Sequence, residues 1–165
     1  MSIKRFSALT LSILVIIGAG LYVLVRDNNG ANQTSTKSSA PTTATANYSG
    51  KGLTAFPKEI LDRTNLLSLD LSNNNLTGAL PAEIKNLTKL ETLDVSNNEM
   101  TGIPAEIGQM KNLKVINYAN NKITGLPLEL GNLTGLQVLD LRGNGISQYD
   151  LGRIRPKLPN TEIKL

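Results

Sequence analysis

One spacing of leucines recurs through most of the chain and limits what it can fold into. The frame LxxLxLxxNxL starts at residue 66 and returns at residues 90, 113 and 136, so the period is 24 and then 23 residues. A unit of this length forms one supersecondary element, which cannot bury its apolar face alone and has to stack on copies of itself. The sequence therefore predicts a solenoid.

The residues that fill this frame resemble those of the leucine-rich repeat family. The apolar fillers alternate at the fourth and sixth positions, as a strand requires, and are Leu69/Leu71, Leu93/Val95, Ile116/Tyr118 and Leu139/Leu141. The resemblance implies an α/β fold: a short right-handed horseshoe segment of a solenoid with a parallel concave sheet of about five strands and short convex helices. The first repeat contains LTGALP, one residue longer than MTGIP and ITGLP in the next two repeats, and is similar to the plant-type consensus.

An asparagine follows each strand at the bend of the frame. Its amide can both donate to and accept from backbone groups that the turn would otherwise leave buried and unpaired. Because these amides recur at the repeat period, we expect a structural ladder of stacked hydrogen bonds formed by Asn74, Asn98, Asn121 and Asn144.

The returning half of each repeat carries Pro-x-Glu. Proline suits the first position of a helix, and glutamate in the first turn complements the helix dipole. The pattern predicts short helices or helical turns after residues 57, 81, 104 and 127, whose inward side chains are Ile84, Leu87, Ile107, Met110, Leu130 and Leu133.

The family resemblance covers residues 48–165. Residues 48–65 look like an N-terminal cap, a half repeat whose strand is missing or degenerate. The repeats are then predicted at 66–89, 90–112, 113–135 and 136–159, the last containing a helix capped by Ser147, and a closing strand at 160–165.

Three segments precede the repeats. Residues 1–5 contain two cations, and residues 6–25 carry no charge for a length that, as a helix, spans a bilayer core. We predict a transmembrane signal-anchor helix at 6–25 with a short cytoplasmic N-terminus, because the basic residues precede the span. The repeat domain then lies outside the cytoplasm, on the cell membrane; cleavage after the small residues at 18–20 would make it secreted. Residues 26–47, rich in Thr, Ser and Asn, are predicted to be a disordered linker.

Charge and composition exclude several functions. Residues 48–165 hold 13 Lys and Arg against 12 Asp and Glu, which leaves no basic stripe for a nucleic acid. The chain has no Cys and no His, so thiolate and imidazole chemistry and the usual zinc ligands are missing, and we predict no cofactor or metal. Paired cysteines are usual in the end caps of plant and animal extracellular members of the family, so their absence indicates a bacterial protein.

The candidate binding residues are the variable positions between the leucines. In the family that the chain resembles, these positions form the concave face that usually binds partners. They are Leu67, Ser68, Asp70, Glu91, Thr92, Asp94, Lys114, Val115, Asn117, Gln137, Val138, Asp140 and Arg142.

Stacked carboxylates such as Asp70 and Asp94 could serve a glycosidase or hold a cation. An open strand face offers no pocket that excludes water, and Asp is a common filler at this position of the family consensus. The first hypothesis is therefore a non-catalytic module that binds a protein or another envelope ligand of unknown identity. The alternative is a structural or adhesive envelope component that self-associates or acts as a spacer, and the third hypothesis, an enzyme acting on glycans, has the least support.

Overall fold

The computed structural model describes residues 12–17, 20–25 and 44–165. The chain divides into two compact units, Met1–Thr42 and Thr43–Leu165, which are described separately because their relative placement is not determined.

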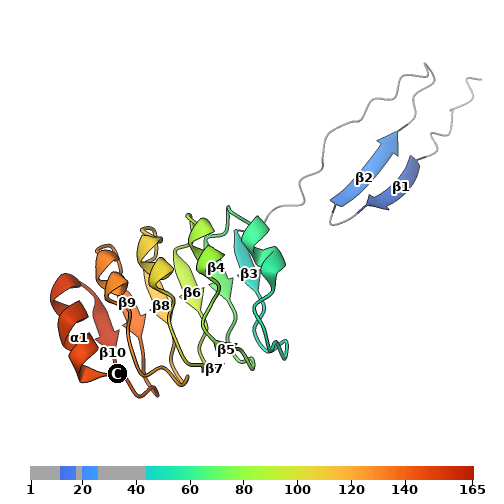
Figure 1. Cartoon of the computed structure of the whole chain (residues 1–165). Helices are drawn as coiled ribbons and strands as arrows, with labels where there is room; N and C mark the ends of the chain where they lie inside the picture. The colour runs from blue at the N-terminus through green and yellow to red at the C-terminus, as the bar shows by residue number, and fades with distance from the viewer. Residues whose placement is uncertain (1–11, 18–19, 26–43) are drawn as a thin grey trace, which may run out of the picture. The chain divides into compact units, whose positions relative to one another are not determined.

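The second unit is a solenoid built on one parallel sheet (Figure 1). Its strands, in spatial order, are β10 (Glu162–Lys164), β9 (Val138–Asp140), β8 (Val115–Asn117), β6 (Thr92–Asp94), β4 (Ser68–Asp70) and β3 (Thr45–Asn47). Five of the six strands are those that the repeat frame and the closing segment predict.

The sixth strand, β3, corrects two expectations. Its residues were assigned to the linker that ends at residue 47, and the strand of the first rung was expected to be missing or degenerate. In the structure Ala46 pairs with Leu69 and is only 2% exposed. The cap therefore begins before residue 48, and the sheet has six strands rather than about five.

Short 3-10 helices return the chain along the convex side of the sheet (Figure 1). They are η1 (Lys58–Asp62), η2 (Ala82–Asn86), η3 (Ala105–Gln109) and η4 (Leu128–Asn132). Each has the expected glutamate in its first turn, but the proline lies just before the first helical residue, in extended backbone. The six side chains predicted to face inward from these turns and the residues after them are all buried.

The C-terminal part departs from the repeat as predicted. Helix α1 (Gln148–Ile154) begins after Ser147, whose hydroxyl accepts a hydrogen bond from the N–H of Asp150. It continues into η5 (Arg155–Lys157), where Pro156 ends the α-helical geometry, and the chain then enters β10. A second small sheet pairs β5 (Thr77–Gly78) with β7 (Glu99–Met100) in parallel.

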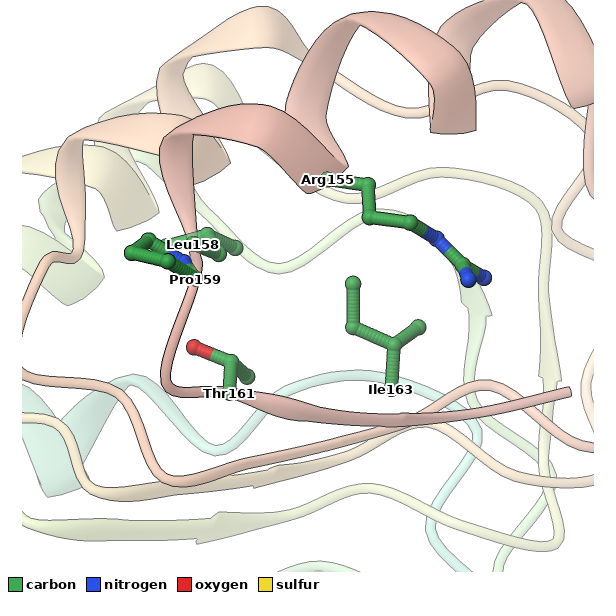
Figure 2. A pocket seen from close by; sticks show the side chains of 5 residues that line it. All are labelled: Arg155, Leu158, Pro159, Thr161 and Ile163. Carbon is green, nitrogen blue, oxygen red and sulfur yellow. The ribbon is translucent and has the colours of Figure 1, made fainter.

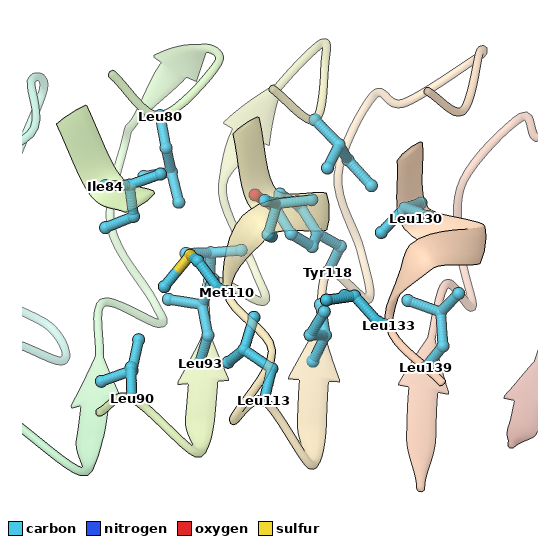
Figure 3. Packing of buried hydrophobic residues seen from close by; sticks show 14 of the residues in the cluster. Leu80, Ile84, Leu90, Leu93, Met110, Leu113, Tyr118, Leu130, Leu133 and Leu139 are labelled. Atoms are coloured by element: carbon cyan, nitrogen blue, oxygen red, sulfur yellow. The ribbon is translucent and has the colours of Figure 1, made fainter. Parts of the chain in front are cut away.

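The apolar fillers form one continuous core between the sheet and the convex turns (Figure 3). Leucines of equivalent position stack from rung to rung, and Leu69, Leu93, Ile116 and Leu139 are fully buried. Tyr118 occupies the place of Leu71 and Val95 and is 0% exposed, so it packs in the core as its position predicts. Its phenol oxygen has no hydrogen-bond partner among the described residues, and burial raises its pKa above the ordinary value.

Replacing Tyr118 with phenylalanine should therefore stabilise the domain. The ring is kept and a buried hydroxyl without a partner is removed, so we expect the free energy of unfolding to rise by about 1 kcal/mol. Urea denaturation of the two proteins measures the change. The control is Tyr149→Phe, at a ring that is 72% exposed, where the effect should stay within about 0.5 kcal/mol. A Tyr118→Phe protein less stable than the parent would contradict the unpaired hydroxyl.

The first unit contains two strands where a helix was predicted. Strands β1 (Ser12–Ile17) and β2 (Gly20–Val25) pair antiparallel. Their Ile and Val residues are β-branched, which favours strands, and Gly18 lies between them. Among the described residues, no helix has both the length and the apolar character needed to cross a membrane. The rest of the predicted span, residues 6–11 and 18–19, and the predicted segments 1–5 and 26–43 lie outside the described residues.

Candidate functional site

The variable residues of the frame lie on one face of the parallel sheet. Register places them in columns that run across the strands. The first strand residues form the column Thr45, Ser68, Thr92, Val115, Val138 and Glu162, and the third residues form the column Asn47, Asp70, Asp94, Asn117, Asp140 and Lys164. The structure therefore brings together the side chains that the sequence assigns to the concave face.

The carboxylates and amides of the third-residue column accept hydrogen bonds from the turn that follows each strand. Asp70 Oδ1 accepts the N–H of Ser72 at 2.9 Å, and Asp94 Oδ1 accepts the N–H and hydroxyl of Ser96 at 2.8 and 2.6 Å. Asn117 does the same for Ala119, and its Nδ2 donates to Asp94 Oδ2 at 3.0 Å. These side chains order the turn after each strand, a local role that the sequence did not indicate.

Asp140 and Arg142 form the strongest charge pair of this face. Arg142 Nη2 donates to Asp140 Oδ2 at 2.6 Å, and Nε lies 3.0 and 3.1 Å from the two carboxylate oxygens. The aspartate side chain is 7% exposed and the arginine side chain 61%. The hydrogen bonds from the Arg142 side chain hold the pKa of Asp140 below its usual value, against the effect of its burial.

This lowered pKa makes part of the stability pH-dependent. A carboxyl whose folded pKa lies below its unfolded pKa of about 3.9 stabilises the fold fully above that value, and the contribution is lost as the pH falls through the folded pKa. Arg142→Gln should therefore be less stable than the parent protein at pH 7, and the difference should shrink towards pH 3. Urea denaturation at both pH values measures it, and a difference that stays constant would refute the coupling.

The most accessible column precedes the strands. It consists of Leu67, Glu91, Lys114 and Gln137, of which Leu67 is 41% exposed. Within residues 44–165 these four side chains make no hydrogen bond or ion pair to another side chain. One apolar, one acidic, one basic and one amide side chain therefore follow each other from rung to rung and are free to contact a partner.

The predicted asparagines hold the turns together from inside. Asn98 Oδ1 accepts the N–H of Leu76 at 2.9 Å, and its Nδ2 donates to the carbonyls of Leu71, Val95 and Ser96 at 3.0 to 3.1 Å. Asn74, Asn121 and Asn144 repeat this arrangement one rung apart. Their amides bond to the backbone of their own rung and of the rung before it.

A second row of amides lies on the surface beside them. Asn97 Nδ2 donates to Asn73 Oδ1 at 3.1 Å, and Asn120 Nδ2 donates to Asn97 Oδ1 at 2.8 Å. All three have φ between 55° and 57°, a conformation that asparagine tolerates better than most residues. Gly143 continues the row at φ 71°, and a Cβ there would collide with Asn120 Oδ1. The hydrogen bonds of this row were not predicted, although the repeated Asn-Asn pairs in the sequence were a signal for them.

The carboxylates of Asp70 and Asp94 are engaged with the turns that follow them. Among the described residues, no group of three or more acidic side chains is placed to hold a metal ion. Asp70 and Asp94 lie on an open strand face, and both accept hydrogen bonds from their own turns.

Several known proteins are similar to this chain in sequence or structure. A family model described as a leucine-rich repeat region matches residues 57–150. A leucine-rich repeat protein of Leptospira interrogans is similar over 67% of this chain and 28% of its own, at 43% identity and a TM-score of 0.63. The BIR3–SERK2 complex of Arabidopsis thaliana matches over 56% of this chain and 51% of its own, at 38% identity and a TM-score of 0.53.

A third solved structure, the Arabidopsis receptor kinase HAESA with the peptide hormone IDA and the co-receptor SERK1, is 32% identical at a TM-score of 0.55. The match covers 66% of this chain and 19% of that one. The chain thus spans between about a fifth and a half of the length of these three structures. No curated protein sequence matches it.

Proposed function

The chain belongs to the leucine-rich repeat family, and from this premise we propose that its repeat domain is a non-catalytic module that binds a protein or peptide on the concave sheet face. Domains of this family are typically protein-binding modules. Two of the similar structures are complexes, one between two proteins and one with a peptide hormone and a co-receptor.

The proposal rests on the positions at which the repeats differ from one another. Inward positions hold Leu, Ile or Val in nearly every rung, and the bend carries asparagine in all four full repeats. The column Leu67, Glu91, Lys114 and Gln137 changes its chemistry at every rung, and its side chains are exposed except for that of Lys114, which is half-buried. Building the solenoid does not require this variety, whereas recognition of one partner does.

The size of the face limits what it can bind alone. Six strands spaced by about 4.8 Å, each of three residues at about 3.4 Å, give roughly 290 Å². A standard protein interface takes about 800 Å² from each partner. The concave face therefore suits a peptide or a weak protein contact, and a stable complex would use the flanking loops as well.

The test exchanges two charges on this face. Full-length protein carrying Glu91→Lys and Lys114→Glu keeps its net charge, and we expect it to lose the partner that the parent captures from an envelope extract. The control, Glu83→Lys with Lys85→Glu, makes the same exchange on exposed residues of η2 on the convex side. Equal capture by both variants would show that the concave face is not the binding surface. An apparent molecular mass of the parent protein that increases with its concentration in analytical ultracentrifugation would favour self-association instead.

We further propose that the domain works outside the cytoplasm. Support comes from the uncharged run at residues 6–25, which follows Lys4 and Arg5 and is typical of export signals. Protease added to intact cells should then degrade the repeat domain while a cytoplasmic marker survives. Protection of the domain in intact cells, lost on lysis, would refute this location.

A further inference from the structure

Two columns of side chains run side by side across strands β4, β6, β8 and β9 (Figure 1). The first, called the variable column here, has long side chains and consists of Leu67, Glu91, Lys114 and Gln137. The second, called the neutral strip, has half-buried side chains without charge and consists of Ser68, Thr92, Val115 and Val138. The concave face therefore has a low uncharged strip with a row of longer side chains along one side.

The spacing of the variable column matches the pitch of an α-helix. Strands about 4.8 Å apart place its four side chains over a length of about 14 Å. A helix that lies across the strands presents one side chain per turn of 5.4 Å, which is about 16 Å over three turns. An extended chain presents every second side chain, at steps of about 6.8 Å, which is about 20 Å. A helix thus stays within about 2 Å of register over four rungs, and an extended chain does not.

The width of the face also suits a helix. Each of the four strands has three residues, which gives about 10 Å, and an α-helix with its side chains is about 10 to 12 Å wide. The pocket of about 200 Å³ in Figure 2 lies elsewhere, between η5 and β10, and is lined by Arg155, Leu158, Pro159, Thr161 and Ile163. None of these residues belongs to the variable column or the neutral strip, so a partner of this face rests on its surface.

The two charges of the variable column do not neutralise each other. Among residues 44–165, no ion pair joins Glu91 to Lys114. A Cβ on Gly135 would lie 3.1 Å from Nζ of Lys114, so this ammonium lies over the glycine in the turn before β9. The Glu91 side chain is exposed. Each of the two charges can therefore pair with an opposite charge of a partner.

We propose that the partner of the concave face presents an α-helix, which lies across the strands along the neutral strip. This inference rests on the function proposed above and adds the form and the chemistry of the partner. One side chain per helical turn contacts the variable column: an apolar one at Leu67, a cation at Glu91, an anion at Lys114 and a polar one at Gln137. Small side chains of the helix face the neutral strip, so that the helix lies close to the sheet.

The probe is a fluorescently labelled peptide, AALAKARAAEAKAQAA. Its alanines favour a helix, on which leucine, arginine, glutamate and glutamine lie on one face, one per turn. Two control peptides have nearly the same composition and the same net charge. AALAKAARAEAKAQAA moves the arginine off this face, and AALAKARAPEAKAQAA breaks the helix with a proline. In fluorescence anisotropy with the full chain, we expect the probe to bind about tenfold more tightly than either control.

A charge exchange between protein and peptide tests the predicted pairing at Glu91. The peptide AALAKAEAAEAKAQAA carries glutamate in place of the arginine, and the parent protein should bind it about tenfold more weakly than the probe. The Glu91→Lys protein should reverse this preference. The control is Glu83→Lys, which makes the same change of charge on an exposed residue of η2 and should keep the preference of the parent.

Three outcomes would contradict the helix. Equal binding of the proline peptide would indicate an extended partner, and equal binding of the peptide with the displaced arginine would remove the match to the rungs. An unchanged preference in the Glu91→Lys protein would show that the peptide binds elsewhere.

The capture experiment on envelope extract separates this inference from the proposed function. If the Glu91→Lys, Lys114→Glu protein loses its partner while the peptides show no preference, the concave face binds a partner that is not a helix. If that protein keeps its partner while the peptide preference still reverses with Glu91→Lys, the face accepts a helix, and the captured partner binds at another surface.

Discussion

Replacing Asn121 with alanine is expected to lower the free energy of unfolding by about 2 kcal/mol, which is a large share of the stability of a small domain. The amide is 8% exposed and lies in the middle of the solenoid. Its Oδ1 accepts the N–H of Met100 at 2.9 Å, and its Nδ2 donates to the carbonyls of Val95 and Tyr118 at 3.0 Å.

The size of the effect follows from which backbone groups lose their partner. The carbonyl of Tyr118 also accepts from Asn144, so it stays hydrogen-bonded in the variant. The carbonyl of Val95 likewise accepts from Nδ2 of Asn98, so of these three groups the N–H of Met100 is the one left without its partner. Leaving a buried polar group unpaired costs about 1 to 3 kcal/mol, which gives the expected loss of about 2 kcal/mol.

Urea denaturation measures this loss against a matched control. Asn86→Ala removes an exposed asparagine at the end of η2, and its effect should stay within about 0.5 kcal/mol. If both variants lose the same stability, the buried asparagines do not hold the turns, and the stacked leucines alone account for the fold.

The repeat frame predicted the rungs because its leucines and asparagines have a purely structural task. Leu69, Leu93, Ile116 and Leu139 recur at one spacing and pack on one another, so spacing alone locates them. Strand β3 was not predicted because Ala46 occupies the position that leucine holds in the other repeats. Its neighbours Thr45 and Asn47 belong to a polar, Thr-rich stretch whose composition suggested a linker.

The concave face was predicted as a set of residues but not as a set of contacts. Alternation along a strand shows that Asp70 and Asp94 share a face. It does not show that both carboxylates turn back to the N–H groups of Ser72 and Ser96, because that bond depends on the path of the chain after the strand. For residues 12–25 the apolar composition suits a helix or a strand, and β-branching together with Gly18 favours the strands observed.

Gly108→Ala, on the convex side, should lower the free energy of unfolding by about 2 kcal/mol. The cause is a close packing contact that the sequence alone does not indicate. In η3 this glycine stands where η2 has Lys85, so the sequence alone suggests a tolerant surface position. The structure shows instead that Gly108 is buried, and that a Cβ there would collide with the carbonyl oxygen of Glu129 and lie 2.7 Å from its carbonyl carbon. Backbone cannot rotate away as a side chain can, so either η3 or η4 has to shift.

Two other glycine-to-alanine variants provide comparisons for this loss of stability, which is measured by urea denaturation. A Cβ on Gly131 would meet the Lys157 side chain, 2.5 Å from Cδ, and a flexible lysine can move, so Gly131→Ala should cost less than Gly108→Ala. A Cβ on Gly152, in α1, meets nothing within 4 Å, and alanine there should stabilise the helix by about 0.5 to 1 kcal/mol. The expected order of stability is therefore Gly152→Ala above the parent, then Gly131→Ala, then Gly108→Ala. A Gly108→Ala protein as stable as the parent would mean that the convex turns can separate freely, and that close packing of η3 on η4 does not set the spacing of these rungs.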